Sequence, residues 1–514
     1  MTHARGEAAW LEQARTQTLR GQLAAAQATL DKALAEYPAS SELRRTQAGI
    51  LQRTRRDAEA EAILRELLAA DAADAASAFA LARLLQGQGR TAAAAATLRA
   101  CLARDPHASD ANLAIQAIEL LDDCDRKRDA AAIALSAISG NPEDARLHAY
   151  AAMLQMQLGK FEQARAHYLF ALQRDEHAWE WHMPIGLSAA QRYANGQHPD
   201  FELFRGGLQH KDLSGKARAE LHFALGKAHD DIGDYEEAAR HFREGNATVR
   251  RLTKWSRKAW RRTVEARLAS KPIAHRLESS AEFTPIFIVG MPRSGTTLIA
   301  ELLSRYPKVC NRGELPWVAT LSERPGLSGS PGRAELQRAA ETYAAQSRRD
   351  DAGDTHWFLD KQPLNFCYID LILAMFPDAK IIHCQRNPRD TALSLWSQCF
   401  LKDVQGYSYD FDDISLVMRG CDKLMAHWNS RHPGSIRTLR YEELVSDPER
   451  VSGALAGWIG LPTRTDTPPA ESRSSISTAS LWQARQPINT RSIGRWRNYA
   501  PYVPELLHFP EQAH

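Results

Sequence analysis

Apolar residues in the first half of the chain recur at a helical spacing. A small residue is followed by an apolar one four positions later and by another three positions after that. Triplets of this kind are Ala26/Leu30/Ala33, Ala60/Leu64/Leu67, Ala94/Leu98/Cys101, Ala164/Tyr168/Ala171 and Ala238/Phe242/Gly245. The first three are evenly spaced along the chain, the fourth comes two such intervals plus two positions later, and the fifth follows after a longer gap. This spacing predicts amphipathic helices in successive, similar units.

Glycines mark the turns of these units. Gly21, Gly89, Gly159 and Gly233 each lie five positions before the first alanine of a triplet, where a turn between two helices belongs. A helix–turn–helix period of about 34 residues is typical of tetratricopeptide (TPR) repeats, which stack into a superhelix with a concave surface. We therefore predict TPR repeats over residues 1–176 and again over 219–252. The equal intervals disfavour the alternative, an ordinary helical bundle.

Two segments interrupt this pattern. Residues 177–218 contain several turn signals and aromatic residues, and are either a divergent repeat or an insertion. Residues 250–276 are strongly basic, and we predict a basic helical linker over 253–284. Such a charge run is usually a solvated helix. The sequence leaves open whether it contacts a donor or an acceptor molecule.

The pattern changes at about residue 285 to short apolar strands that alternate with amphipathic helices. We expect strands at 286–289, 357–359, 379–385 and 435–441, and helices at 298–307, 365–377, 389–400 and about 415–430. This alternation predicts a parallel sheet with crossover helices on its faces. The expected fold class is thus an N-terminal all-α TPR superhelix followed by an α/β P-loop-like domain with a central parallel sheet, residues 285–514. Ligands of such sheets bind beyond the carboxyl ends of the strands.

Composition narrows the class of protein. Lys and Arg (65) nearly balance Asp and Glu (62), for a formal charge of +3, which argues against a nucleic-acid-coating protein. The seven cysteines are scattered without a C-x-x-C pair, so neither a disulfide framework nor a zinc site is expected from them. No secretory signal and no apolar run long enough to cross a bilayer are evident. We expect a soluble, cytoplasmic protein.

The stretch PIFIVGMPRSGTT (285–297) has the glycine spacing of a phosphate-binding P-loop, with Thr296 in place of the lysine. Backbone N–H groups of such a loop and the following hydroxyls can surround a phosphate. Without the lysine or an aspartate-ended Walker B strand, a triphosphate hydrolase is disfavoured. A loop that holds one 5′-phosphate, with Arg293 over the group to be transferred, fits better. The residues assigned to this cradle are Pro292, Arg293, Ser294, Gly295, Thr296 and Thr297.

A second candidate phosphate site follows the strand at 379–385. Arg386 lies at its carboxyl end and Ser394 on the next helix, so a guanidinium and a hydroxyl can converge on one phosphate. Arg389 is a further positive charge there. Each of these residues alone has an ordinary structural interpretation. Together with the first loop they predict a nucleotide that carries two separate phosphates.

These motifs resemble those of sulfotransferases. GMPRSGTTL resembles the 5′-phosphosulfate loop of that family and RNPRDTALS its 3′-phosphate motif. The resemblance extends over most of residues 285–500 and is nearest to the tyrosylprotein sulfotransferase type and to bacterial sulfotransferases that carry TPR repeats. It implies that the donor is 3′-phosphoadenosine-5′-phosphosulfate (PAPS).

The resemblance also implies roles for individual residues. NRGELPW (311–317) is similar to the segment with the catalytic glutamate, here Glu314, and DKQP (360–363) places Lys361 near the bridging oxygen. The C-terminal segment resembles the loop that closes over PAPS. It supplies Ser480 near the leaving phosphate, with Arg495 and Trp496 beside the nucleotide. Tyr441 resembles the adenine-side tyrosine, although a tyrosine that fills the core is an equal alternative.

Several other residues near these motifs receive smaller roles. Cytosolic small-molecule sulfotransferases use a histidine base, but His356 lacks that pattern and is interpreted as structural or superficial. His383, in the middle of a strand, is interpreted as a core residue. Arg485 and Arg491 are weaker candidates for the nucleotide site. LPW after Glu314 departs from the second acid and arginine of the animal enzymes, which leaves the choice of acceptor open.

The leading hypothesis is a PAPS-dependent sulfotransferase that needs no metal and acts on a hydroxyl, with protein tyrosine as the first candidate. The TPR groove would bind a peptide or protein, either the acceptor or another partner. A saccharide or lipid-linked acceptor is an alternative. So are a TPR scaffold with an inactive, nucleotide-binding second half and an atypical P-loop kinase. The sequence leaves the oligomeric state open, with a homodimer as one option.

Overall fold

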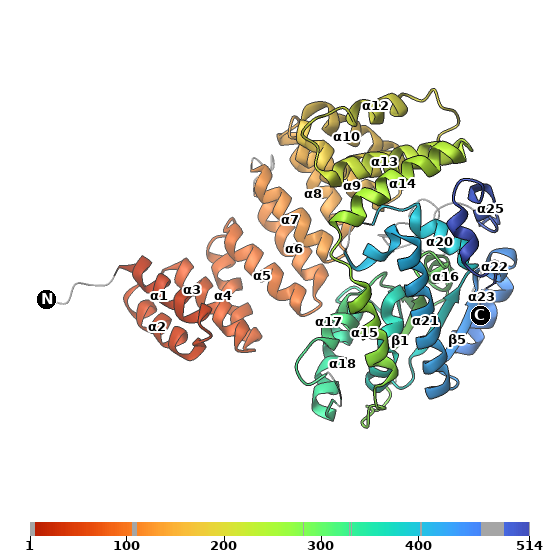
Figure 1. Ribbon diagram of the computed structural model, residues 1–514. Helices are drawn as coiled ribbons and strands as arrows, with labels where there is room; N and C mark the ends of the chain where they lie inside the picture. Colours follow the sequence, from red (N-terminus) through yellow and green to blue (C-terminus); the bar gives the residue numbers. More distant parts are fainter. Residues whose placement is uncertain are drawn as a thin grey trace. The chain divides into compact units, whose positions relative to one another are not determined.

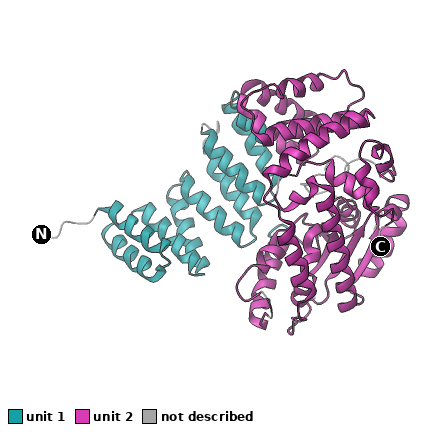
Figure 2. Ribbon diagram, viewed as in Figure 1, with its two compact units in different colours: residues 1–150, 349–351 teal, residues 151–348, 352–514 magenta. Residues whose placement is uncertain are grey.

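The computed structural model describes residues 6–104, 110–280, 282–327, 329, 331–400, 403–463 and 488–512 of the 514-residue chain. The chain divides into two compact units, each of which is described by itself. Unit 1 comprises residues 1–150 and 349–351, and unit 2 residues 151–348 and 352–514 (Figure 2).

Unit 1 is a series of helix hairpins (Figure 1). Its helices are α1 (Glu7–Leu19), α2 (Leu23–Glu36), α3 (Ser41–Arg53), α4 (Asp57–Ala70), α5 (Ala75–Gly87), α6 (Thr91–Leu102), α7 (Ala111–Asp123) and α8 (Lys127–Gly140), and α9 (Ala145–Gln157) runs on into unit 2. The predicted triplets are buried on the second helix of their hairpins, and Ala26, Leu30 and Ala33 are all fully buried. Helix α8 supplies the degenerate copy with Ala130, Ala134 and Ala137.

The turns inside the hairpins share one backbone conformation. Gly21 and Gly89 have φ values of 75°, in the left-handed region that glycine adopts without a steric cost. In the two hairpins between and after them, Arg55 (φ 64°) and Asp125 (φ 58°) stand at the same position. The turn geometry is therefore kept even where the glycine is absent, which explains why glycine alone did not mark every repeat.

Unit 2 begins with further helices. These are α10 (Phe161–Arg174), η1 (Glu176–Glu180), α11 (Met183–Ala189), α12 (Pro199–Gly207), α13 (Gly215–Asp231), α14 (Tyr235–Leu252) and α15 (Arg257–Leu268). The interruption at 177–218 thus consists of short helical segments before the long α13–α14 hairpin. Gly186 on α11 lies against the Tyr168 ring of α10, where a Cβ would come within 2.3 Å of the ring.

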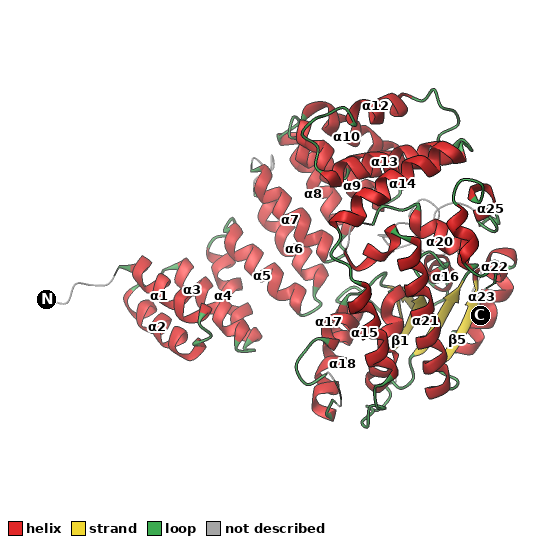
Figure 3. Ribbon diagram, in the orientation of Figure 1, coloured by secondary structure: helices red, strands yellow, loops and turns green. Residues whose placement is uncertain are grey.

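A five-stranded parallel sheet follows, shown in yellow in Figure 3. The strands are β1 (Thr284–Gly290), β2 (Val309–Asn311), β3 (Trp357–Asp360), β4 (Lys380–Gln385) and β5 (Ile436–Arg440), in the order β2-β3-β1-β4-β5. Ile286 of β1 is in register with Leu359 of β3 and Lys380 of β4. The four predicted strands are present, and the short edge strand β2 is an addition. The predicted fold class, TPR-like helices before a parallel-sheet domain, is confirmed.

Helices cover both faces of the sheet. The remaining helices are α16 (Thr296–Leu303), α17 (Trp317–Ser322), α18 (Arg333–Arg348), η2 (Pro363–Tyr368), α19 (Ile369–Met375), α20 (Pro388–Trp396), η3 (Asp403–Tyr409), α21 (Phe411–Arg431), α22 (Tyr441–Ser446), α23 (Pro448–Ile459), α25 (Trp496–Tyr499) and η4 (Pro504–His508). Phe287 and Val289 of β1 pack in one core with α18, α19 and α21, and Ile286 and Ile288 in the other with α16 and α23. In the described residues no helix is long and apolar enough to cross a bilayer.

Polar contacts join the last helices before the sheet to helices α20 and α21 of the sheet domain. Asn246 Nδ2 on α14 donates to the carbonyl of Trp396 at 2.9 Å. The basic segment is held at the start of α21, where Arg250 and Arg257 pair with buried Asp413. Trp260 on α15 packs against Gly420 of α21. The basic linker is therefore anchored to the sheet domain by charge pairs rather than solvated throughout.

Candidate active site

The predicted site residues in the described part of the chain follow the carboxyl ends of the strands. Arg293 follows β1, Glu314 follows β2 and Lys361 follows β3, while Arg386 follows β4 and Tyr441 follows β5. Because the strands are parallel, these ends meet at one edge of the sheet. Five separate segments thus contribute to a single candidate site.

The loop between β1 and α16 depends on two glycines. Gly290 has φ 137°, and a Cβ there would lie 2.3 Å from the Cys384 carbonyl of β4. Gly295 has φ 95°, and a Cβ there would lie 2.5 Å from the Tyr441 ring. Arg293 also adopts a left-handed φ of 74°, a strained conformation for a residue with a side chain. Such strain is typical of functional loops.

Hydrogen bonds connect the two predicted phosphate motifs. Arg293 Nε donates to Ser394 Oγ at 2.9 Å, and Arg386 Nη1 donates to the Arg293 carbonyl at 3.0 Å. The Arg386 guanidinium also lies over the Tyr441 ring, 4.8 Å from its centroid. The structure therefore brings together Arg293, Arg386, Ser394 and Tyr441, as the sequence predicts.

Positive charge is concentrated in this part of the site. Burial, with the nearby guanidiniums of Arg386 and Arg495, lowers the pKa of Arg293 to about 10. Burial also lowers the pKa of Arg386. Buried like charges repel, so this arrangement gains stability when an anion enters it.

Hydrogen bonds hold the described end of the C-terminal segment against the same arginine-rich part of the candidate site. Asp390 at the start of α20 accepts from Gly494 N at 2.6 Å and from Trp496 N at 2.9 Å. Arg386 Nη2 donates to the Ser492 carbonyl at 2.7 Å. Trp496 is buried, with Arg389 over its ring at 4.5 Å. The described end of the segment therefore lies at the arginine-rich loop; Ser480 and Arg485 lie outside the described residues.

Arg495 is held by the helical part of unit 2. Its Nη2 lies 2.5 Å from Oδ1 of Asp230 at the end of α13, and the Tyr499 hydroxyl donates to the same oxygen. Burial alone would lower the pKa of Arg495, but Asp230 raises it above the ordinary value. Asp230 could not be predicted from the sequence, because nothing near it in the chain indicates a partner in the C-terminal segment.

The candidate site also contains an ion pair between a lysine and a glutamate. Lys361 Nζ lies 2.5 Å from Glu314 Oε1, with the lysine side chain buried and the glutamate side chain partly exposed. Backbone bonds hold both segments: Lys361 N donates to the Gly313 carbonyl at 2.8 Å. A buried ammonium beside an accessible carboxylate offers both an electrophilic group and a proton acceptor.

A buried carboxyl beside this pair was also missed. Asp360 ends β3, is 1% exposed and accepts from Tyr343 Oη at 2.9 Å. Burial raises its pKa to about 7, against the opposing hydrogen bond from Tyr343. The available signal was the aspartate that ends the apolar strand WFLD. The expectation that no apolar strand ends in an aspartate was therefore wrong, whereas the lysine is absent from the loop as the sequence shows. Asp360 is positioned to support the loop that carries Glu314, since Leu315 N points to it at 3.4 Å.

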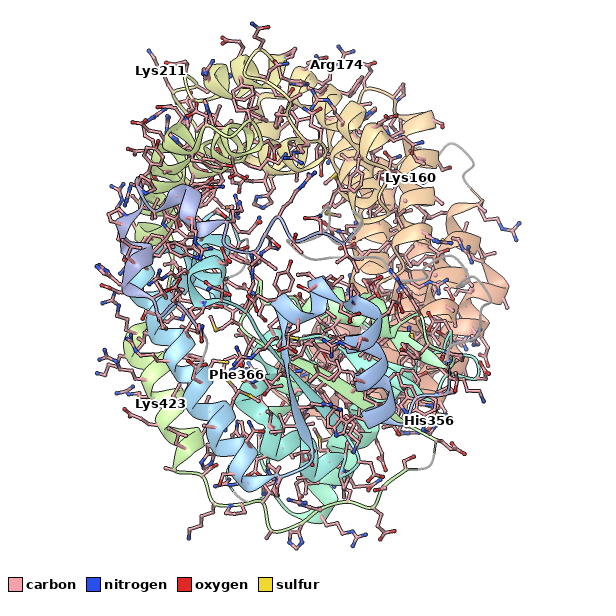
Figure 4. The ribbon with its side chains drawn as sticks, turned by 90° about the vertical axis from the view of Figure 1, so that its right-hand side faces the viewer. Lys160, Arg174, Lys211, His356, Phe366 and Lys423 are labelled. Carbon is pink, nitrogen blue, oxygen red and sulfur yellow. The ribbon has the colours of Figure 1, made fainter. Side chains whose placement is uncertain are left out.

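The two histidines near the strands lie away from this chemistry. His356, labelled in Figure 4, precedes β3, and its Nε2 lies 3.2 Å from Oγ1 of Thr284, the first residue of β1. It therefore belongs to the opposite, amino-terminal edge of the sheet. His383 is buried within β4, and burial lowers its pKa to about 4. Both placements agree with their interpretation as structural residues.

The residues present fit a donor with two phosphates. The buried Oγ of Ser294 and Nε of Arg386 have no hydrogen-bond partner in the described structure. Unsatisfied buried polar atoms are rare in folded proteins. Here both atoms belong to the predicted phosphate motifs, so a bound anion would give them hydrogen-bond partners. Thr296 and Thr297 at the start of α16 add hydroxyls beside the free N–H groups of the helix end.

Comparison with known proteins agrees with this geometry. Residues 285–466 match the profile of the Sulfotransferase family, and residues 219–245 match a tetratricopeptide repeat profile. This match supports the predicted enzyme class for residues 285–466. The second match supports the repeat assignment of α13–α14.

Two curated relatives and one of the matching solved structures illustrate the similarity. An uncharacterized protein of Aquifex aeolicus is 29% identical over 322 residues, 58% of this chain and 42% of the relative. The nodulation protein NoeE of Sinorhizobium fredii is 26% identical over 252 residues, 41% of this chain and 59% of the relative. The sulfotransferase domain of the Synechococcus PCC 7002 olefin synthase is 18% identical, with a TM-score of 0.34, over 48% of this chain and 99% of that domain. The chain thus spans less than two thirds of either relative.

Proposed function

We propose that this chain transfers a sulfuryl group from PAPS to the hydroxyl of an acceptor. The observation that carries the proposal is the meeting, at one sheet edge, of a lysine-free phosphate loop with the Lys361–Glu314 pair. The loop and Arg386 would hold the two phosphates, with Ser394 beside them. Tyr441 and Trp496 would contact the nucleotide, and Arg495 would add charge to the same group.

In the proposed reaction the acceptor oxygen attacks sulfur in line with the leaving phosphate. A new S–O bond forms, and the bond between sulfur and the bridging oxygen of the 5′-phosphate breaks. Glu314 takes the proton of the acceptor hydroxyl. Lys361, Arg293 and Ser480 stabilise the negative charge on the transferred group and on the departing adenosine 3′,5′-bisphosphate. Positioning and these charges supply the catalysis, and we propose no metal for it.

The acceptor is proposed to be a polypeptide, with tyrosine as the first candidate hydroxyl. TPR repeats commonly bind peptides along their concave surface, and the resemblance of the catalytic motifs to the tyrosylprotein type favours the same class. Incubation of a cell lysate with sulfur-labelled PAPS tests this proposal. Label in protein supports a polypeptide acceptor. Label in polysaccharide or lipid would instead identify that class as the acceptor and would leave the proposed donor unchanged.

Two substitutions test the chemistry itself. Glu314→Gln should lower kcat by about 10²–10⁴-fold while binding of adenosine 3′,5′-bisphosphate is kept, because only the proton acceptor is lost. Arg293→Ala should lower both turnover and nucleotide affinity, each by roughly tenfold or more. The matched controls are Glu323→Gln and Arg305→Ala, at exposed positions of the same domain.

Calorimetry together with a turnover assay distinguishes the enzyme from an inactive scaffold, because a nucleotide-binding scaffold would bind adenosine 3′,5′-bisphosphate without turnover. Binding of adenosine 3′,5′-bisphosphate together with wild-type turnover supports the proposal, and near-wild-type sulfation by Glu314→Gln contradicts the assigned base. Magnesium-dependent ATP binding instead would favour a kinase.

A further inference from the structure

The α13–α14 hairpin contains a cluster of histidines that the proposed sulfotransferase reaction does not use. His229 lies near the end of α13, and Glu237 and His241 lie one turn apart on α14. One ligand atom from each of these three side chains lies within 4.8 Å of the other two. Residues four apart on a helix share one face, so both α14 side chains are directed toward the end of α13.

Each histidine has one ring nitrogen occupied by a neighbouring side chain. His229 Nδ1 lies 2.9 Å from Oδ2 of Asp234, the residue that caps α14. His241 Nδ1 lies 3.1 Å from Nδ1 of His222. When these partners accept the Nδ1 protons, both Nε2 atoms keep their lone pairs. A second carboxylate or ring behind each histidine is the arrangement that orients imidazoles toward a metal ion.

The other ring nitrogen of His229, Nε2, makes no hydrogen bond in the described structure. His229 is 6% exposed, and its Nε2 is buried without a hydrogen-bond partner. An unsatisfied buried ring nitrogen costs free energy, which a bound ligand would recover.

A cationic side chain already stands at this cluster. Arg240 Nη2 lies 2.5 Å from Oε2 of Glu237 and 3.0 Å from Nε2 of His241. Its side chain is 53% exposed, so the guanidinium can leave at the small cost of an exposed ion pair. The cluster therefore attracts a cation, and the present one is replaceable.

We propose that His229, Glu237 and His241 form a binding site for a divalent transition-metal ion, with Zn²⁺ as its best occupant. Two imidazoles and one carboxylate are a donor set that zinc accepts in tetrahedral sites, with the fourth position left to water. Mg²⁺ and Ca²⁺ prefer oxygen ligands and would bind poorly. A bound ion would join the end of α13 to α14, next to Asp230, which holds Arg495.

Titration calorimetry of chelator-treated full-length chain with Zn²⁺ tests the site. We expect binding at a one-to-one ratio, a loss of at least roughly tenfold in affinity for His229→Gln and for His241→Gln, and no response to Mg²⁺. His148→Gln, which alters a buried histidine of unit 1, is the matched control. Co²⁺ should give the visible absorption of a tetrahedral complex in the wild type and not in His229→Gln.

A variant with the opposite expected effect separates metal binding from misfolding. Arg240→Ala removes the competing cation and should bind Zn²⁺ more tightly than the wild type. Zn²⁺ should also raise the melting temperature of both proteins, since a ligand of the native state stabilises it. Unchanged Zn²⁺ affinity in both histidine variants, or no binding by either the wild type or Arg240→Ala, would overturn the proposal.

Discussion

The first repeats and the last repeat are built on the same pattern but have different neighbours. In α1–α8, ion pairs such as Arg45–Asp74 and Arg90–Glu61 join residues about one repeat apart. In α13–α14, Asn246 bonds the carbonyl of Trp396, and Asp230 bonds Arg495 and Tyr499 near the end of the chain. A repeat that contacts only other repeats adds its own increment of stability, whereas a repeat that packs on the sheet domain is stabilised together with that domain.

The difference shows that a repeat profile alone does not define a role. Phe242 occupies the large position of its triplet as Leu98 does in α6, and both are buried. Yet the Phe242 ring also contacts Trp396 of α20, at 5.8 Å between centroids, as well as Phe223 of its own hairpin. The last repeat is therefore packed into unit 2 together with the sheet domain, and substitutions at matched positions should separate the two roles.

The largest effect is expected at the large triplet residue. Phe242→Ala should destabilise unit 2 by about 3–5 kcal/mol, because it opens a cavity between two helices and the sheet domain. It should also weaken binding of adenosine 3′,5′-bisphosphate. Leu98→Ala should cost about 2–5 kcal/mol locally and leave nucleotide binding unchanged. Urea unfolding and calorimetry measure both, and equal loss of nucleotide binding in the two variants would remove the distinction.

The next effect is expected at the buried amide. Asn246→Ala removes the bond to the Trp396 carbonyl and leaves that carbonyl unsatisfied, which should cost about 1–3 kcal/mol of unfolding free energy. Asn112→Ala, at a surface position on α7, should change stability by less than about 0.5 kcal/mol. A cost for Asn246→Ala no larger than for this control would show that the contact does not couple the repeat to the domain.

A smaller but functional effect is expected at Asp230. Asp230→Asn removes the charge that holds Arg495, so affinity for adenosine 3′,5′-bisphosphate should fall roughly tenfold, as expected for one charged hydrogen bond. Asp31→Asn on α2 makes the same change in the first repeats and should leave affinity unchanged. If Asp230→Asn loses melting temperature but keeps its affinity, Asp230 has a structural role only.

The smallest effect is expected at the surface. Arg243 on α14 pairs with Glu505 of η4 at 2.7 Å, and both side chains are partly exposed, at 43% and 34%. A double-mutant cycle of Arg243→Ala and Glu505→Ala should give a coupling of less than about 1 kcal/mol that weakens in salt. A coupling well above this value would make the ion pair a principal link between the last repeat and the domain.

Local patterns in the sequence predicted much of this molecule. The triplets predicted the repeat helices because each apolar spacing reports directly on a buried face. The loop after β1 and the RNPRDTALS segment predicted the arginine-rich half of the site, because residues after parallel strands must meet at one edge. Edge strand β2 was missed, since so short a strand shows no period.

Contacts between distant segments could not be predicted in the same way. The sequence placed Arg495 near the nucleotide by resemblance, but its partner Asp230 carries no local mark of that role. Asp360 was overlooked because a strand-end aspartate is common at surfaces, and only the folded chain shows it buried. The cysteines offered no zinc site, and the histidines of α13–α14 come together only through the hairpin turn.

The threonine at position 296 limits how this loop could be re-engineered. The Thr296 side chain is buried. In the same loop, the charges of Arg386 and Arg495 already lower the pKa of Arg293. Replacement by lysine would restore the letters of a nucleotide-triphosphatase loop but would bury a fourth positive charge among these groups. A change from the proposed phosphosulfate donor to a triphosphate would therefore require the removal of arginines first, so the two chemistries are separated by several coupled substitutions.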